Sequence, residues 1–231
     1  MSQTPSRVPR FFTWKRILFA LVGLPLLVFL AAFIAILVFA AFLPELDRSV
    51  PIRADRTIVN KLGDYKVTFL KTTHETAGAY ELVQVELAPG GGNEWHYHDV
   101  FVEKFHVLQG QLSIGLDGKE HTLTSGQRAE VPMNTLHRFY NTSSDVAVFT
   151  VEINPARSFE KTLRIGYGLC NDGHCNERGI PRNPWHLFLM LAYSESYPPV
   201  VPSFIQEPLI PALARIAQWK GEHHALEQYY R

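Results

Sequence analysis

The sequence has no excess of charge of either sign, since its 231 residues contain 22 lysines and arginines and 22 aspartates and glutamates. Binding of nucleic acid normally needs a surplus of positive charge, so the composition gives no reason to expect a nucleic-acid partner. The chain also lacks internal repeats and low-complexity tracts. Frequent aromatic residues and modest charge indicate a folded protein, with room for one domain and an attachment.

Charge is missing altogether from residues 17–43, which read ILFALVGLPLLVFLAAFIAILVFAAFL. About 20 apolar residues suffice to cross a bilayer, so we predict a transmembrane helix over residues 17–43, with the lipid bilayer as its partner. A cleaved signal peptide is the alternative, but its apolar region normally spans only about 7 to 15 residues. A buried core helix would normally keep a polar stripe, and this run has none.

The charges on the two sides of this run differ. Residues after it are of mixed sign, whereas residues 1–16 carry no acidic side chain and four basic ones, Arg7, Arg10, Lys15 and Arg16. The positive-inside rule therefore predicts a cytoplasmic N-terminus at residues 1–16. Everything after residue 43 is then expected on the periplasmic or extracellular side.

Cysteine is scarce, and the only two residues, Cys170 and Cys175, lie in the stretch CNDGHC. An exported location would permit a disulfide between them, whereas two residues this close can also remain free thiols. A structural zinc site that includes Asp172 and His174 is a third reading, but no second ligand pair follows at zinc-finger spacing. The disulfide and the free thiols both stay open.

Residues 44–62 read as a polar connection, and residues 63–154 read as an all-β domain. Runs such as YKVTFLKTT and AYELVQVEL are apolar or alternating and rich in β-branched residues. Asp117-Gly118 lies between two alternating runs, which is the strongest short signal for a β-hairpin. Many short strands with glycine and proline turns favour a sandwich or a barrel.

Residues 155–231 have a different character and are expected to form a C-terminal extension with short helices. Helices are predicted over residues 184–196 and 207–230, the second with an apolar stripe at Leu209, Leu213 and Ile216. The apolar core of the first helix is too short to span a membrane, so we expect this helix to pack on the β domain. Covering one end of that domain and forming a homodimer are two roles left open for the extension.

The stretch NEWHYHDVFVEKFHVLQG, residues 93–110, carries candidate metal ligands. His96 and His98 are two residues apart, so on a strand both side chains point to the same face. Glu103 would face the other way in an unbroken strand, and its convergence with the histidines requires a turn or bulge within residues 99–102. Ordinary solvated side chains on an open sheet face are the alternative reading for this stretch alone.

A second stretch, GQRAEVPMNTLHRFYN at residues 126–141, supplies the partner that the first one lacks. Together the two stretches resemble the paired motifs of the cupin superfamily, over roughly residues 63–154. The leading motif corresponds to Gly90, His96, His98, Glu103 and Gly110, and the trailing motif to Gly126, Pro132, Asn134, His137 and Asn141. The family normally has glycine where this chain has Asn134, and asparagine tolerates the positive φ of such a turn.

This resemblance implies an all-β jelly-roll (cupin) β-barrel, with the transmembrane helix before it and the helical tail after it. It also implies a divalent metal held by His96, His98, Glu103 and His137. Imidazole and carboxylate ligands suit Fe, Mn, Ni, Co, Cu or Zn, and four protein ligands leave two octahedral positions for water, dioxygen or substrate. The four aromatic residues near the ligands are expected to pack in the core; they are Phe101, Phe105, Phe139 and Tyr140.

Two functions follow as hypotheses. The first is a membrane-anchored oxidoreductase of dioxygenase type that acts on a small molecule, with Glu103 as ligand and catalytic proton acceptor. The second is a non-catalytic module that binds or senses a metal or small molecule at the membrane surface. The fold supports many functions, so it does not decide between them.

Overall fold

The computed structural model describes Trp14, Ile17 and residues 19–231. The chain divides into two compact units, Met1–Phe42 and Leu43–Arg231. Each unit is described by itself. The basic residues used to predict orientation, Arg7 to Arg16, lie outside the described residues.

The first unit contains one long apolar helical segment. A π-helical turn, η1 (Phe19–Gly23), leads into the α-helix α2 (Leu24–Ala41), and Pro25 sits in the first turn of α2, where proline is tolerated. Together they form a segment of 23 residues, Phe19–Ala41, that is long and apolar enough to cross a membrane. The helix is therefore a candidate membrane span by its length and composition.

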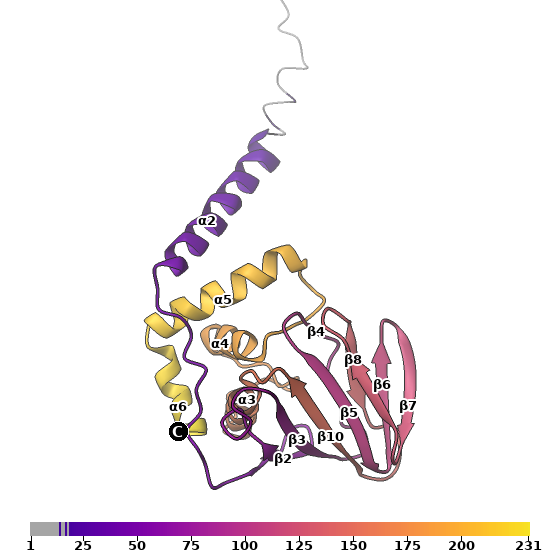
Figure 1. Ribbon diagram of the computed structural model, residues 1–231. Coiled ribbons are helices and arrows are strands. Elements are labelled where there is room, and N and C mark those ends of the chain that lie inside the picture. The colour runs from indigo at the N-terminus through magenta and orange to yellow at the C-terminus, as the bar shows by residue number, and fades with distance from the viewer. Residues whose placement is uncertain (1–13, 15–16, 18) are drawn as a thin grey trace, which may run out of the picture. The chain divides into compact units, whose positions relative to one another are not determined.

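The second unit begins with antiparallel β-sheets. A six-stranded sheet has the order β1-β2-β3-β10-β5-β8, a three-stranded sheet has the order β7-β6-β9, and β11 pairs with β4. Figure 1 shows β6 and β7 on the far side of β5 and β10 from the helices. The strands are β1 (Thr57–Asn60), β2 (Tyr65–Lys71), β3 (Glu81–Leu87), β4 (Tyr97–His98), β5 (Val102–Gln109), β6 (Gln111–Leu116), β7 (Lys119–Thr124), β8 (Arg128–Val131), β9 (His137–Tyr140), β10 (Ala147–Asn154) and β11 (Ser196–Tyr197).

The two larger sheets bury one core between them. In β3 and β10 every second residue is buried, as expected when one face of a sheet is covered. Phe105, Phe149 and Ile153 of the six-stranded sheet share this core with Leu112 and Ile114 of β6. The expected antiparallel jelly-roll arrangement is present. The prediction of a closed barrel is wrong, because no sheet closes on itself within the described residues.

Two local backbone predictions are confirmed. Asp117 and Gly118 connect β6 to β7 with φ angles of 45° and 78°, and both positive values suit the tight turn of a hairpin. Asn134 has a φ of 62°, so it takes the left-handed conformation that the resemblance required of it.

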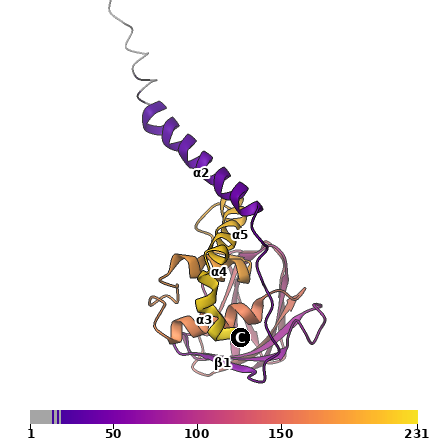
Figure 2. The same cartoon turned by 90° about the vertical axis from the view of Figure 1, so that its left-hand side faces the viewer.

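The helices follow the last long strand and enclose a second core. They are α3 (Phe159–Asn171), α4 (Pro184–Ser194), α5 (Ser203–Trp219), the 3₁₀-helix η2 (Glu222–Leu226) and α6 (Glu227–Tyr230). Figure 2 shows α3, α4 and α5 side by side on one side of the sheets. The helix predicted over residues 184–196 is present as α4. The one predicted over residues 207–230 is divided, because Gly221, with a φ of 83°, ends α5.

The structure adds three features to what was expected of this region. Helix α3 was not predicted. Cys170 and Cys175 form a disulfide at the end of α3. The connection predicted over residues 44–62 contains β1 and binds the helices, since Leu46 and Val50 pack against the second core. The domain boundaries assigned from the sequence stay predictions.

Candidate metal centre

Three separate elements bring the four candidate ligands together. His98 lies in β4 and His96 just before it, Glu103 lies in β5, and His137 begins β9. His96 and His137 form an isolated bridge in which each backbone N–H donates to the other's carbonyl, at 2.9 and 2.8 Å. Residues paired in this way place their side chains on one face, and the two imidazole rings are 4.2 Å apart between centroids.

Glu103 reaches the same point because the chain turns after His98. The backbone bends at Asp99 and Val100 before β5 begins at Val102. Glu103 is then paired with Ile153 of β10 and Val131 of β8, and its side chain faces the interior. The turn that the sequence demanded within residues 99–102 is therefore present.

The side chains are close and buried. Oε2 of Glu103 lies 3.0 Å from Nε2 of His137 and 3.6 Å from Nε2 of His98. The ligand atoms of His96, Glu103 and His137 all lie within 4.8 Å of one another. His98 and His137 are fully buried and Glu103 is 6% exposed, so the cluster is not a solvated strand face.

Backbone carbonyls fix the orientation of two of the imidazoles. Nδ1 of His96 lies 2.9 Å from the carbonyl oxygen of Glu94, and Nδ1 of His137 lies 2.9 Å from that of Thr135. A carbonyl only accepts, so each Nδ1 carries the hydrogen and each Nε2 is turned toward the cluster. Such a contact is how proteins orient histidines that bind metals. In both motifs the carbonyl comes from two residues earlier, a regularity that sequence reasoning missed.

His98 differs from the other two histidines. Both of its ring nitrogens are buried without a hydrogen-bond partner, and the ring stacks on Phe101 with centroids 4.0 Å apart. A buried polar atom without a partner costs free energy, so such atoms are rare in folded proteins. An unpartnered imidazole nitrogen aimed at a buried carboxylate is the atom that a metal ion would satisfy. The residues present therefore fit a bound divalent metal.

Burial and mutual contacts shift the pKa values of the candidate ligands. Burial alone would raise the pKa of Glu103, but the hydrogen bond from His137 and the nearby His98 outweigh it and hold that pKa well below its usual range. Burial opposes protonation of His137, yet the contact with Glu103 raises its pKa. His96 has no such partner, and burial beside His137 lowers its pKa to about 4. The contact between them thus favours an ionised Glu103 and a protonated His137.

The aromatic residues near the ligands do not share one role. Phe101 and Phe105 are buried and Phe139 packs against the same core, as expected. Tyr140 was expected in the core, but its hydroxyl donates to Glu120 at 2.6 Å and Arg138 lies over its ring. The polar group of Tyr140 thus stays on the outer face of the three-stranded sheet.

A second group of histidine and glutamate side chains lies near the C-terminus. His223, His224 and Glu227 bring three ligand atoms within 4.8 Å of one another. Glu227 is already paired with His224 at 3.2 Å and with Arg231 at 3.3 Å. This positive neighbour opposes a cation there, so the group is a weaker candidate than the buried cluster.

Comparison with known proteins gives matches to the β domain. A family model described as Cupin domain matches residues 83–153. Quercetin 2,3-dioxygenase of Bacillus subtilis (strain 168) is 32% identical over 77 residues, which are 33% of this chain and 23% of that protein. Protein SchB of Streptomyces halstedii is 30% identical over 93 residues, which are 40% of this chain and 67% of that protein.

Solved structures also match part of the chain. KdgF from Halomonas sp. is 19% identical with a TM-score of 0.41, and the match covers 48% of this chain and 97% of that one. A predicted oxalate decarboxylase from Thermotoga maritima is 19% identical with a TM-score of 0.40, over 43% of this chain and 90% of that one. The chain spans about a quarter of the length of the dioxygenase.

Proposed function

The chain belongs to the cupin superfamily, and we propose that it holds one divalent metal ion through His96, His98, Glu103 and His137. We further propose that the bound metal serves an oxidation of a small molecule by dioxygen. The unpartnered Nε2 of the buried His98, 3.6 Å from the Glu103 carboxylate, carries the first part of this proposal.

The donor set is chemically suited to the proposed ion. Three imidazoles and one carboxylate are ligands for Fe, Mn, Ni, Co, Cu or Zn, and no sulfur ligand lies among them. A bound divalent metal would supply Lewis acidity and, if redox-active, the electron transfer that dioxygen chemistry needs. Similarity to a quercetin 2,3-dioxygenase over a third of the chain supports this choice of reaction class.

The side chains of the cluster have distinct parts in this proposal. His96 and His137 are held by backbone carbonyls, so their Nε2 atoms stay directed at one point. Glu103 stays ionised at neutral pH, so it attracts a cation. As the carboxylate of the cluster, it is also the proton acceptor that we propose for a bound hydroxyl. Phe101 covers the ring of His98 and keeps water from it.

We also propose that the chain is anchored in a membrane by Phe19–Ala41, with the β domain on the periplasmic or extracellular side. The uncharged length of this segment and the basic residues before it support this topology. The disulfide between Cys170 and Cys175 supports it independently, because disulfides persist in oxidising compartments.

Dioxygen consumption tests the proposed reaction. The full chain, purified in detergent, is loaded in turn with Fe(II), Mn(II), Co(II), Ni(II) or Cu(II) and mixed with a panel of phenols and diketones in an oxygen electrode. We expect uptake that needs both metal and substrate and that disappears in His98→Ala. Stoichiometric metal without uptake on any compound would contradict the oxidation and identify a binding module instead. Absence of metal binding would contradict both the metal site and the oxidation.

A further inference from the structure

The strand that carries the proposed ligand His98, directly after His96, is short and depends on its neighbours. β4 contains only Tyr97 and His98. On one side the second motif holds it, through the bridge between His96 and His137 and through the N–H of Asn134, which donates to the carbonyl of His98 at 2.7 Å. A strand of this length has too few ladder hydrogen bonds of its own to fix its position.

The other side of β4 is held by the C-terminal extension. β11 pairs with β4 in antiparallel register, with Ser196 opposite His98 and Tyr197 opposite Tyr97. β11 directly follows α4 and lies beyond residue 153, where the match to the family model ends. The extension is thus part of the frame around the proposed ligands.

Tyr97 carries a second link between the ligand strand and the extension. Successive side chains of a strand point to opposite faces, so Tyr97 points away from the face shared by His96 and His98. Its hydroxyl donates to Oε1 of Glu207 at 3.0 Å and accepts from Nε2 of Gln206 at 3.2 Å. Both partners lie in the first turns of α5 (Ser203–Trp219).

Gln206 is itself held in place. It is 4% exposed, and its Nε2 also lies 3.1 Å from the carbonyl oxygen of Pro198 and 2.9 Å from that of Val201. These contacts tie the segment between β11 and α5 to the same point. The ring of Tyr97 packs on Tyr197 with centroids 5.5 Å apart, which completes the attachment of β4 to the extension.

We infer that Glu207, acting through the hydroxyl of Tyr97, is a positioning residue for the metal site, with Gln206 as a second anchor. This inference rests on the proposed metal binding by His96 and His98. A metal site needs its ligands held within about 0.5 Å of the productive geometry. Because Tyr97 lies between the two histidines, release of its hydroxyl frees the backbone that sets both imidazoles.

The test measures metal affinity of the full chain in Tyr97→Phe, Glu207→Ala and Glu207→Gln, with Co(II) as the probe and a chelator as competitor. We expect Tyr97→Phe and Glu207→Ala to weaken Co(II) binding by about tenfold, the lower end of what loss of a supporting contact costs. Glu207→Gln keeps an acceptor oxygen for the hydroxyl and should retain most of the affinity. The double variant Tyr97→Phe/Glu207→Ala should be no weaker than Tyr97→Phe alone, because loss of the hydroxyl already removes the contact with Glu207.

A matched control removes a similar hydrogen bond elsewhere in the extension. The hydroxyl of Tyr229 donates to Oδ2 of Asp172 at 2.9 Å, away from β4, so Tyr229→Phe should leave Co(II) affinity unchanged. An equal loss in Tyr229→Phe, or unchanged affinity in both Tyr97→Phe and Glu207→Ala, would overturn the inference.

Amide hydrogen exchange separates this inference from the proposed function. In the metal-free protein, exchange at residues 96–98 should be faster in Tyr97→Phe and Glu207→Ala than in the wild type and in Tyr229→Phe. If the wild type binds no Co(II), the proposed function fails while exchange still decides whether Glu207 positions β4. Exchange at wild-type rates in both variants would overturn the positioning role.

Discussion

Oε2 of Glu103 and Nε2 of His137 lie 3.0 Å apart, although 34 residues separate them in the chain. Nδ1 of His137 already donates to the carbonyl of Thr135, so a hydrogen bond to Glu103 requires a second hydrogen, on Nε2. The contact raises the pKa of His137 against the effect of burial and so favours this proton on the atom that a metal would take. A metal bound at Nε2 would displace the proton.

Metal affinity should fall as the pH falls. Contact with Glu103 raises the pKa of His137 despite the opposing effect of burial, so the imidazole is still protonated at pH values where a free histidine is neutral. Binding must displace this proton, and affinity should drop by about tenfold per pH unit below the raised pKa. Competition titrations with Co(II) between pH 5.5 and 8.5 measure the slope. Affinity that stays constant over this range would contradict the protonated pair.

The predictable parts of the site are those set by local backbone rules. The spacing of His96 and His98, the turn required before Glu103, and the positive φ of Asn134 all follow from neighbouring residues. The hairpin at Asp117-Gly118 is local in the same sense. For these features the sequence reasoning and the structure agree.

The features that the sequence did not predict depend on contacts between distant residues. Helix α3 includes Gly166 and Gly168, which lower helix propensity, and a Cβ at Gly168 would lie 2.1 Å from the ring of Tyr229. Packing against α6, rather than local helix propensity, therefore accounts for the helix at this stretch. β11 has two residues and no periodicity to detect. Along β9, isolated bridges from Gly92 to Tyr140 and from His96 to His137 take the place of a continuous ladder, so no barrel closes among the described residues.

Asn141 should contribute strongly to the stability of the β domain. It is 1% exposed, its Nδ2 donates to the carbonyls of Leu87 and Asp145 at 3.0 and 2.8 Å, and its Oδ1 accepts from the N–H of Ser143. Asn141→Ala leaves these groups without partners and should lower the free energy of unfolding by about 2–4 kcal/mol. Denaturant unfolding of the full chain in detergent measures the loss.

The half-buried Asn60 gives the control for this variant, since its Oδ1 accepts only from the N–H of Leu62 at 3.1 Å among the bonds described. Asn60→Ala should change the free energy of unfolding by no more than about 0.5 kcal/mol. Equal losses of unfolding free energy in the two variants would show that the buried hydrogen bonds of Asn141 do not stabilise the protein more than the single bond of Asn60.

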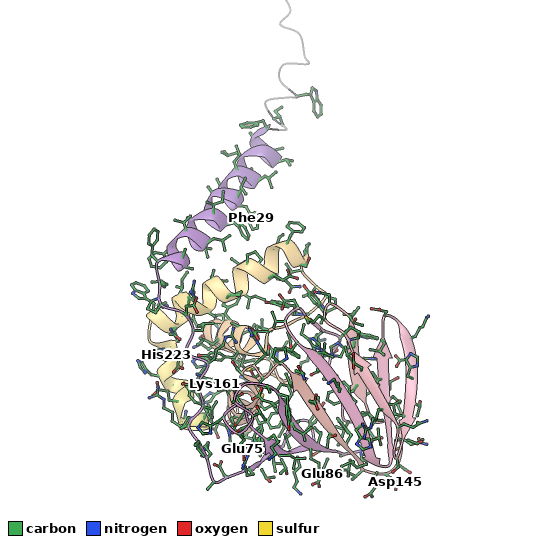
Figure 3. The ribbon with its side chains drawn as sticks, in the orientation of Figure 1. Phe29, Glu75, Glu86, Asp145, Lys161 and His223 are labelled. Carbon is green, nitrogen blue, oxygen red and sulfur yellow. A yellow bond between two sulfur atoms is a disulfide. The ribbon has the colours of Figure 1, made fainter. Side chains whose placement is uncertain are left out.

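Lys161 should make the stability of the folded protein depend on pH in the alkaline range. It is fully buried among the helices, where Figure 3 labels it, and its Nζ donates to the carbonyl of Asp47 and lies 4.6 and 4.3 Å from the rings of Tyr193 and Tyr230. Burial lowers its pKa to about 8. Between that value and about 10.4 the unfolded chain binds more protons than the folded one, so stability should rise with pH.

The variant Lys161→Met isolates this effect from other groups that titrate in the same range. The difference in unfolding free energy between wild type and variant should move in favour of the wild type by up to about 1.4 kcal/mol per unit between pH 8 and 9.5. Parallel stability curves for the two proteins over this interval would show that Lys161 keeps an ordinary pKa.

The proposed anchor predicts how the chain behaves in cells. The full chain should sediment with membranes and be released by detergent but not by high salt, because the apolar segment Phe19–Ala41 would be embedded in lipid. Protease added to intact cells, after removal of any outer membrane, should digest a C-terminal tag. A tag that is protected from protease in intact cells and cut only after lysis would contradict the predicted orientation.

Metal content of the purified protein shows whether His96, His98, Glu103 and His137 hold a divalent ion. The full chain is purified in detergent without chelators and measured by elemental analysis beside His98→Ala and Glu103→Ala, with His121→Ala as control because His121 is exposed on β7. We expect about one divalent ion per chain in the wild type and in the control, and almost none in the two ligand variants. Absence of metal from the wild type, or a full equivalent in His98→Ala and Glu103→Ala, would contradict the proposed metal site.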